Sequence, residues 1–307
     1  MRSRQHSAAL NRSAALASIA VALLLVALKG WAAWSTHSTA MLGSLADTAL
    51  DLVASLATLV GVWVAAQPED DAHRFGHGKA EAVAAMVQVV LISISALSLG
   101  AHAVEQLLAG SRVGAARDGI GVSVAAIGLT LALLAWQRHV IRRTGSLAIA
   151  ADHAHYQSDL LLNLAVIAAL ALDQFGGIAA ADPLFGLAIA LWLGWGAWRA
   201  SHDAIEQLMD REWPEEKKAR FLEVIARHPE LRGVHAMRTR SAGMRDFVQF
   251  HAAVDGSLSL REAHRVMDEI EAKLQAEFPE LEIIIHPDPE DRIDPPVHPS
   301  GEVLPER

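Results

Sequence analysis

Six long stretches of the chain are almost entirely apolar, and the polar residues gather in the segments between them. The stretches cover residues 14–34, 41–66, 80–107, 122–136, 147–172 and 184–200. A helix needs about 20 apolar residues to cross the hydrocarbon core of a bilayer, because lipid offers the backbone no hydrogen bonds. The pattern therefore predicts an all-α membrane domain of six spanning helices over residues 1–209. The fourth stretch is the shortest, so we expect its helix to extend at both ends.

Basic residues are distributed unequally between the segments that join these stretches. One set precedes the first stretch, separates the second from the third, or follows the fourth: Arg2, Arg4, Arg12, Arg74, Lys79, Arg138, Arg142 and Arg143. The segments on the other side of the membrane hold only Arg112 and Arg117. Because cytoplasmic loops carry an excess of Lys and Arg, we expect both termini in the cytoplasm and the protein in the cell's inner membrane.

The chain changes character near residue 210. Amphipathic periodicity predicts a helix with Pro214 at its first position, and a capping box of Ser259 and Glu262 opens a second helix. The expected elements are a helix that begins at Pro214 and ends before Pro229, strands 233–240 and 246–256, helix 259–278 and strand 281–286. This α-β-β-α-β order predicts a cytoplasmic, two-layer α+β domain of ferredoxin-like type over residues 210–290. The acidic, Pro-rich residues 291–307 have little to bury, and we expect them to be disordered.

Composition agrees with a chain that lies partly in lipid and partly in water. The 307 residues are 52% hydrophobic, yet 20% are charged. Cysteine is absent from the sequence, so any metal must be bound by histidines and carboxylates. The formal net charge of −9 argues against nucleic acid as a partner and suits the handling of cations.

Two pairs of metal-ligand side chains interrupt the apolar stretches. Asp47 and Asp51 lie four residues apart in the second stretch, and His155 and Asp159 lie four apart in the fifth, so each pair shares one face of its helix. Helix caps or packing polar groups are the alternative, but an ionised group inside the membrane costs roughly 2.5–3.5 kcal/mol. Two such pairs in opposed helices therefore predict a tetrahedral site for a divalent cation.

Further candidate ligands lie outside the apolar stretches. Asp70, His73 and His77 fall within eight residues, where Gly76 and Gly78 let the backbone turn; a solvated loop explains these residues equally well. In the predicted cytoplasmic domain, four histidines and one aspartate lie on helix or strand faces that can reach one another. They are His235, His251, His264, His286 and Asp288. Any one of these histidines is more often a surface residue than a ligand.

The motifs "DTALD", "HYQSD" and "DDAHRFGHGKAE", followed by the α-β-β-α-β end, resemble the cation diffusion facilitator family, above all its bacterial zinc and ferrous-iron efflux members. The resemblance implies a homodimeric, proton-coupled antiporter that exports zinc, with cadmium or iron as further substrates. It assigns the transport site to Asp47, Asp51, His155 and Asp159, and a loop metal site to Asp70, His73 and His77. A binuclear cytoplasmic zinc site would use His235, His251, His286 and Asp288, with His264 completing it across the dimer. Lys79 resembles the family lysine that interlocks with an acid, for which Asp210 is the best match.

The ligand types themselves suggest how exchange would work. Aspartate and histidine bind metal only when deprotonated, so protons and metal compete for the same lone pairs. Two other classes remain open: an intramembrane metalloenzyme, and a membrane-anchored metal sensor. The first would need a general base in a motif such as His-Glu-x-x-His, which the sequence lacks. The second would leave the intramembrane pairs without a role. We therefore expect a transporter rather than an enzyme.

Overall fold

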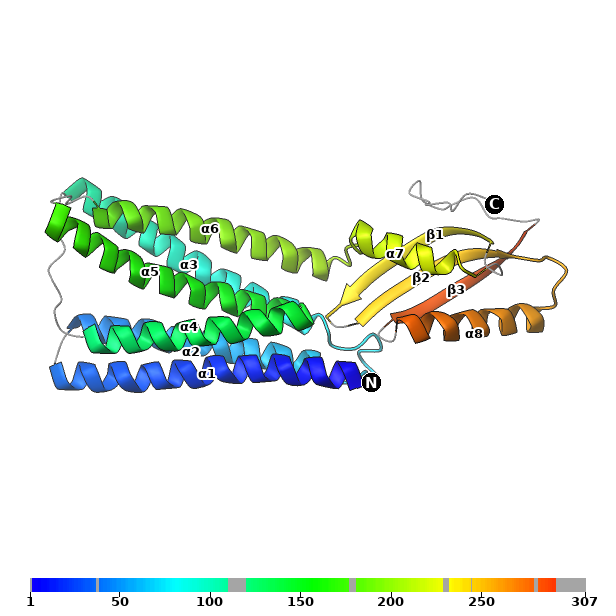
Figure 1. The fold of residues 1–307 in the computed structure, drawn as a ribbon, viewed down its shortest axis with the longest axis horizontal. Helices are drawn as coiled ribbons and strands as arrows, with labels where there is room; N and C mark the ends of the chain where they lie inside the picture. Colours follow the sequence, from blue (N-terminus) through cyan, green and yellow to red (C-terminus); the bar gives the residue numbers. More distant parts are fainter. Residues whose placement is uncertain are drawn as a thin grey trace. The chain divides into compact units, whose positions relative to one another are not determined.

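The structure is a computed structural model that describes residues 2–36, 39–109, 120–176, 181–228, 232–243, 245–278 and 281–290. Its Cα positions separate into two compact units, residues 2–206 and the chain from residue 207 onward (Figure 1). Arg112, Arg117 and the tail 291–307 lie outside the described residues, so the expectations that concern them stay predictions.

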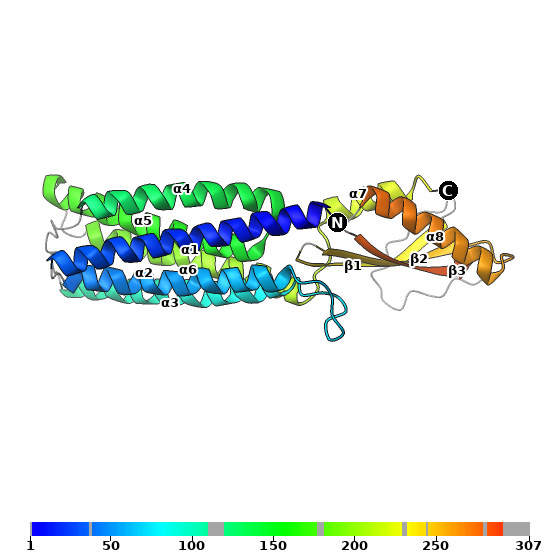
Figure 2. The ribbon, with the colours of Figure 1, turned by 90° about the horizontal axis from the view of Figure 1, so that it is seen from below.

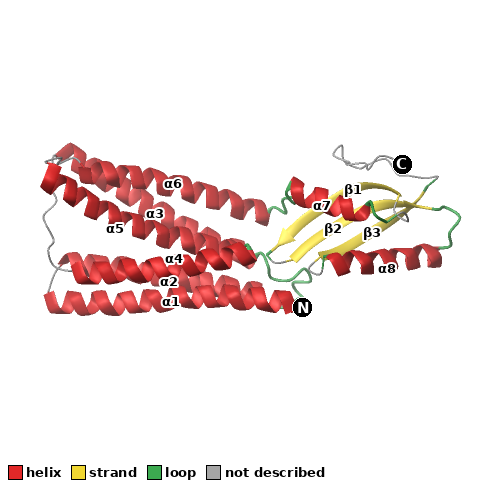
Figure 3. Ribbon diagram, in the orientation of Figure 1, coloured by secondary structure: helices red, strands yellow, loops and turns green. Residues whose placement is uncertain are grey.

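The described residues of the first unit form six long helices, which are drawn in red in Figure 3. They are α1 (Arg2–Thr36), α2 (Thr39–Ala65), α3 (Ala80–Ala109), α4 (Ile120–Thr144), α5 (Leu147–Gly176) and α6 (Ala181–Leu208). As expected, α4 extends beyond its apolar run at both ends. Within the described residues, three segments are long and apolar enough to span a membrane by length and composition: His6–Ser35, Asp47–Ala65 and Ala80–Leu108. Six crossings therefore stay a prediction.

Small residues let these helices pack closely. Figure 2 shows the helices of this unit from a second side. A Cβ added to Gly61 of α2 would lie 2.3 Å from the Cβ of Ala84 on α3, a distance that real side chains do not tolerate. Ala14 of α1 and Ala148 of α5 belong to the same fully buried layer. Large apolar side chains such as Trp31 and Leu97 are instead exposed, at 69% and 75%. Such an outer surface suits lipid better than water.

The second unit is the α+β domain in the predicted element order. Its elements are α7 (Glu215–Ile225), β1 (Arg232–Ala242), β2 (Arg245–Val254), α8 (Leu260–Glu277) and β3 (Leu281–Pro289). The sheet order is β1-β2-β3, with β1 antiparallel and β3 parallel to β2. Both helices and all three strands contribute to one buried core that includes Phe221, Phe250 and Ile270.

The start of α8 agrees with the prediction from the sequence, and the start of α7 differs from it by one residue. The capping box of α8 is present: Glu262 N–H donates to the Ser259 hydroxyl, and Ser259 N–H donates to the Glu262 carboxylate. The Ser259 hydroxyl and N–H both donate to that carboxylate, so the pKa of Glu262 lies below its usual value. Pro214 is the N-cap of α7 and not its first residue, because its ψ of 146° is extended rather than helical.

Candidate metal centres

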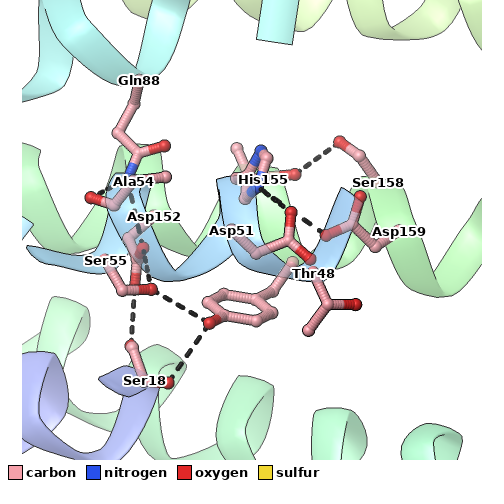
Figure 4. A network of polar contacts seen from close by, with 12 residues as sticks. Ser18, Thr48, Asp51, Ala54, Ser55, Gln88, Asp152, His155, Ser158 and Asp159 are labelled. Carbon is pink, nitrogen blue, oxygen red and sulfur yellow. Dashed lines mark hydrogen bonds and ion pairs between the residues drawn. The ribbon is translucent and has the colours of Figure 1, made fainter. Parts of the chain in front are cut away.

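Three side chains from α2 and α5 form a cluster inside the first unit (Figure 4). His155 Nε2 lies 3.0 Å from Asp51 Oδ1 and 3.8 Å from Asp159 Oδ2. One ligand atom from each of the three lies within 4.8 Å of the others. His155 is buried, while the side chains of Asp51 and Asp159 keep 18% and 34% of their surface exposed. Two carboxylates and one imidazole therefore converge on one point, as a divalent cation requires.

Asp47 is the one predicted transport ligand that lies outside this cluster. It lies one turn before Asp51 on α2, and its side chain is exposed. The neighbouring residue Thr48 is buried and accepts a hydrogen bond of 2.6 Å from Lys29 Nζ of α1. The structure thus brings three of the four predicted ligands together, and the fourth would have to turn inward to join them.

The loop between α2 and α3 brings all three of its predicted ligands together. Asp70 Oδ1 lies 3.1 Å from His73 Nδ1, and Asp70 Oδ2 lies 3.3 Å from His77 Nε2. Gly76 has the left-handed φ of 78° that a glycine allows. Gly78 also lies in a turn, but without a left-handed φ. Among these two glycines, only Gly76 therefore uses the backbone freedom that other residues lack.

Asp70 is held mainly by backbone hydrogen bonds, and this affects its charge. The N–H groups of His73 and Ala72 donate to Asp70 Oδ1 at 2.6 and 2.9 Å. These hydrogen bonds, above all the one from the His73 N–H, hold the pKa of Asp70 below its usual value. His77 Nδ1 faces the Pro68 carbonyl at 3.1 Å, which leaves Nε2 directed at Asp70. The loop therefore presents an ionised carboxylate and two ring nitrogens to one point.

The sheet of the second unit aligns three histidines in one row. His235 of β1 pairs with His251 of β2, and His251 pairs with His286 of β3. Asp288 is the common partner: its Oδ2 lies 3.0 Å from His251 Nδ1 and 3.3 Å from His235 Nε2, and its Oδ1 lies 3.4 Å from His286 Nε2. Asp288 is 3% exposed. A buried carboxylate with three imidazoles around it is a set of ligands typical of zinc.

An irregularity in β1 directs His235 into this cluster. The pairing with β2 shifts register on both sides of His235, and the next residue, Ala236, has a φ of 51°. A left-handed φ is unfavourable for alanine, so the surrounding fold must hold it in place. His235 Nδ1 lies 2.8 Å from the Gly233 carbonyl, an acceptor, so Nδ1 carries the hydrogen. Nε2, 3.3 Å from Asp288 Oδ2, is then the ring nitrogen that would bind a metal shared with this carboxylate.

His264 does not join this cluster within the chain. It lies on α8 with 75% of its side chain exposed, and its Nε2 is 3.7 Å from Asp268. This exposure is compatible with a ligand that is supplied to a second subunit. The role of His264 across a dimer stays a prediction.

Two family models match the chain. The cation efflux transmembrane domain matches residues 15–209, and the cation efflux protein cytoplasmic domain matches residues 213–290. The chain belongs to the cation diffusion facilitator family. It is accordingly a cation efflux transporter and an integral inner-membrane protein, not an enzyme.

Two cation-efflux pumps are similar in sequence to this chain over most of its length, and one solved structure is similar to a shorter part of it. The cation-efflux pump FieF of Pectobacterium atrosepticum is 43% identical over 284 residues, 92% of this chain and 94% of the relative. FieF of Escherichia fergusonii is 40% identical over 276 residues, 90% of this chain and 92% of the relative. A solved structure of CzrB in a zinc form is 35% identical, covers 28% of this chain and 99% of its own, and has a TM-score of 0.26.

The family resemblance pairs Lys79 with Asp210, but these residues belong to different units. Within its own unit, Asp210 Oδ1 lies 3.3 Å from Arg240 Nη1. Asp210 also has an unusual φ of 57°, two residues after the end of α6. The interlock stays a prediction, and any test must account for Arg240 as a second basic partner of the same carboxylate.

If Lys79 interlocks with Asp210, Lys79→Asp should weaken both assembly and transport, because it would set two like charges together. Adding Asp210→Lys should restore part of the function, but not all of it, because the new lysine would lie beside Arg240. Metal flux and dimer content of the single and double variants measure this. Lys217→Asp is a matched control, since Lys217 pairs with Asp246 inside the second unit. Absence of any recovery in the double variant would count against the interlock.

Sequence patterns missed one buried carboxylate next to the transport cluster. Asp152 of α5 has no exposed surface, and Ser18, Gln88 and Gln137 all donate hydrogen bonds to it. A signal for it existed, because Asp152 lies three residues before His155 and so on nearly the same face of the helix. Its partners gave no signal, since single Ser and Gln residues in apolar runs have many roles.

Proposed function

We propose that this protein is a proton-coupled antiporter that exports divalent cations, zinc first, from the cytoplasm. The observation that carries the proposal is the meeting of Asp51, His155 and Asp159 between two long apolar helices. Ionisable groups within membrane helices are costly and occur mainly on ion and proton pathways. The family match supports cation efflux, and the ligand types support zinc, with cadmium or ferrous iron as further substrates.

Exchange would follow from competition at these side chains. The cluster loads metal when its carboxylates and imidazole are deprotonated, and it releases metal when protons take their place. His155 is the natural switch, because the ordinary pKa of histidine lies near working pH. A site that opens alternately to each side of the membrane would then move metal outward and protons inward. Two protons for each divalent ion would make the exchange electroneutral.

The cytoplasmic domain would act as a zinc-dependent dimer contact, with His264 supplied by the second subunit. The cluster around Asp288 supports this role, since a bound cation offsets the repulsion between two acidic chains. Both termini would lie in the cytoplasm, and bilayer lipid, protons and divalent cations would be the other partners.

Replacing His251 and His286 together with alanine is expected to weaken zinc binding and dimer stability while leaving the domain folded, because neither side chain belongs to the buried core. Isothermal titration of the purified full-length protein with zinc, with dimer content checked in parallel, measures this. His228→Ala is a matched control, since His228 lies outside the three clusters. Unchanged zinc stoichiometry in the double variant would remove the cytoplasmic site.

Reconstituted flux distinguishes the transporter from the two other classes. Purified protein in proteoliposomes should move zinc when a pH gradient is imposed, with protons moving in the opposite direction. A sensor would bind zinc without flux, and a metalloenzyme would hydrolyse peptide without it. Parallel runs with cadmium, iron, cobalt, nickel and manganese rank the substrates, which ligand types alone cannot do. If intact dimers in these proteoliposomes transport none of the cations, the proposal is overturned.

A further inference from the structure

A second polar cluster lies beside the transport ligands, centred on Asp152 (Figure 4). Asp152 precedes His155 by three residues on α5, about one helical turn. The proposed exchange at the transport ligands leaves this buried carboxylate without a role. Its hydrogen-bond donors come from four other helices, α1, α2, α3 and α4, and they are Ser18, Ser55, Gln88 and Gln137.

The two oxygens of Asp152 are hydrogen-bonded unequally. Oδ2 accepts two short bonds, from the Ser18 hydroxyl at 2.6 Å and from Gln137 Nε2 at 2.7 Å. Oδ1 accepts two longer ones, from Gln88 Nε2 at 3.2 Å and from the Ser55 hydroxyl at 3.5 Å. Shorter hydrogen bonds stabilise the oxygen that carries negative charge. A proton on this carboxyl group therefore fits on Oδ1.

Gln88 strengthens this assignment. Its Nε2 faces three acceptors: Asp152 Oδ1, the Ala54 carbonyl at 3.0 Å and the Thr58 hydroxyl at 3.0 Å. A primary amide has two N–H groups, so it cannot serve all three at once. The bond to Asp152 is the longest of the three, and the other two remain when Oδ1 is protonated. Protonation thus leaves both N–H groups of Gln88 with acceptors.

Rotating hydroxyl groups let the cluster satisfy Asp152 in both protonation states. When Oδ1 carries a proton, it donates to Ser55 Oγ, the Ser55 hydroxyl donates to Tyr156 Oη at 2.9 Å, and Tyr156 donates to the Ser18 carbonyl at 3.2 Å. When Oδ1 is ionised, the Ser55 hydroxyl turns and donates to it instead. Every donor has an acceptor in either state, so burial does not force one of them.

We propose that Asp152 is a proton-binding site of the transport cycle, separate from the metal ligands, and that loading of the transport cluster expels its proton. The inference rests on the proposed exchange. Among the described side chains, α1, α3 and α4 present only the neutral Ser18, Gln88 and Gln137 to Asp152. The titratable groups near it on α2 and α5 are Asp51, His155 and Tyr156. A divalent cation between Asp51 and His155 favours the ionised carboxylate one turn away. The O–H bond breaks, and the proton passes to water on the side to which the site is open.

Asp152→Asn tests this in the full-length protein, because asparagine keeps the shape but cannot exchange a proton. In the unmodified protein, zinc affinity should rise with pH. In the variant this rise should be smaller by about a factor of ten per pH unit, which corresponds to about one proton fewer released per zinc. Protons released per zinc, counted with a pH-sensitive dye, should fall by about one. Asp203→Asn, an exposed change on α6, is the matched control and should change neither quantity.

Tyr156→Phe gives a second test if Asp152→Asn does not assemble. Phenylalanine removes the acceptor of the Ser55 hydroxyl, which only the protonated state needs. The pH profile of zinc binding should therefore shift to lower pH by about half to one unit, the worth of one hydrogen bond. A hydrogen bond that merely supports the fold would not move the profile.

The outcomes separate this inference from the proposed function. If the unmodified protein releases no protons on binding zinc, the antiport proposal itself fails. If the unmodified protein releases protons and Asp152→Asn releases the same number, only the role of Asp152 is overturned. An unshifted pH profile in Tyr156→Phe would have the same meaning.

Discussion

Asp51→Asn is expected to lower zinc-for-proton exchange by about 100-fold or more while leaving insertion and assembly intact. Changes to residues that merely support metal ligands already cost about 10–100-fold in metal affinity, so loss of a ligand charge should cost at least as much. Asparagine keeps the size of aspartate and relieves the membrane of a charge when the site is empty. Zinc uptake into inside-out vesicles under a proton gradient measures the effect. Near-normal flux would remove Asp51 from the site.

Two further variants sharpen this test. Asp203→Asn on α6 removes one acidic charge outside the clusters and should leave flux unchanged. Asp47→Asn distinguishes a site of three ligands from a site of four, because the structure leaves Asp47 outside the cluster. A loss as large as that of Asp51→Asn would mean that Asp47 turns inward when metal binds. A much smaller loss would mean that Asp51, His155 and Asp159 are the protein's full set of ligands.

His155→Asp is expected to lower the ratio of zinc to manganese transport by about tenfold or more. Imidazole suits zinc, whereas an all-carboxylate site suits manganese, magnesium and calcium. The imidazole also lies within 4 Å of both carboxylates, so its loss changes the contacts of Asp51 and Asp159 directly. Flux of the two ions, measured in the same proteoliposomes, gives the ratio directly.

His102→Asp controls for the added acidic charge, since His102 is exposed on α3 and lies outside the clusters. The control should leave the metal ratio unchanged. An unchanged ratio in His155→Asp itself would show that the histidine does not set selectivity. The carboxylates and the shape of the site would then determine which metal is transported.

Local sequence patterns predicted the helices and strands well, because these elements depend on hydrophobic periodicity and on capping residues that are close together in the sequence. The α-β-β-α-β order and the capping box of α8 both followed from spacing that a few neighbouring residues fix. The first turn of α7 was misjudged by one residue, because Pro214 suits both the N-cap and the position after it. The described residues form six long helices in the first unit, and three of these helices hold described segments long and apolar enough to span a membrane.

Some ligand clusters were predicted more completely than others, because the members of some clusters lie close together in the sequence and those of others lie far apart. The loop cluster is local, so its three residues could be named from spacing. The cluster around Asp288 joins three strands, and its central carboxylate was named as one ligand among several rather than as the contact of all three histidines. Asp152 was missed altogether, since its importance lies in the four helices that bring donors to it.

The sequence by itself determined the kind of protein: apolar runs long enough for a membrane, no thiols, and paired Asp and His residues one turn apart, which together predict a cation transporter. Tertiary structure alone decided which pairs meet. Helix packing through small residues such as Gly61 and Ala84 fixes how far apart α2 and α3 lie, and strand register aligns His235, His251 and His286. Periodicity tells which face of an element a side chain occupies, but the partner across that face depends on contacts between residues far apart in the chain.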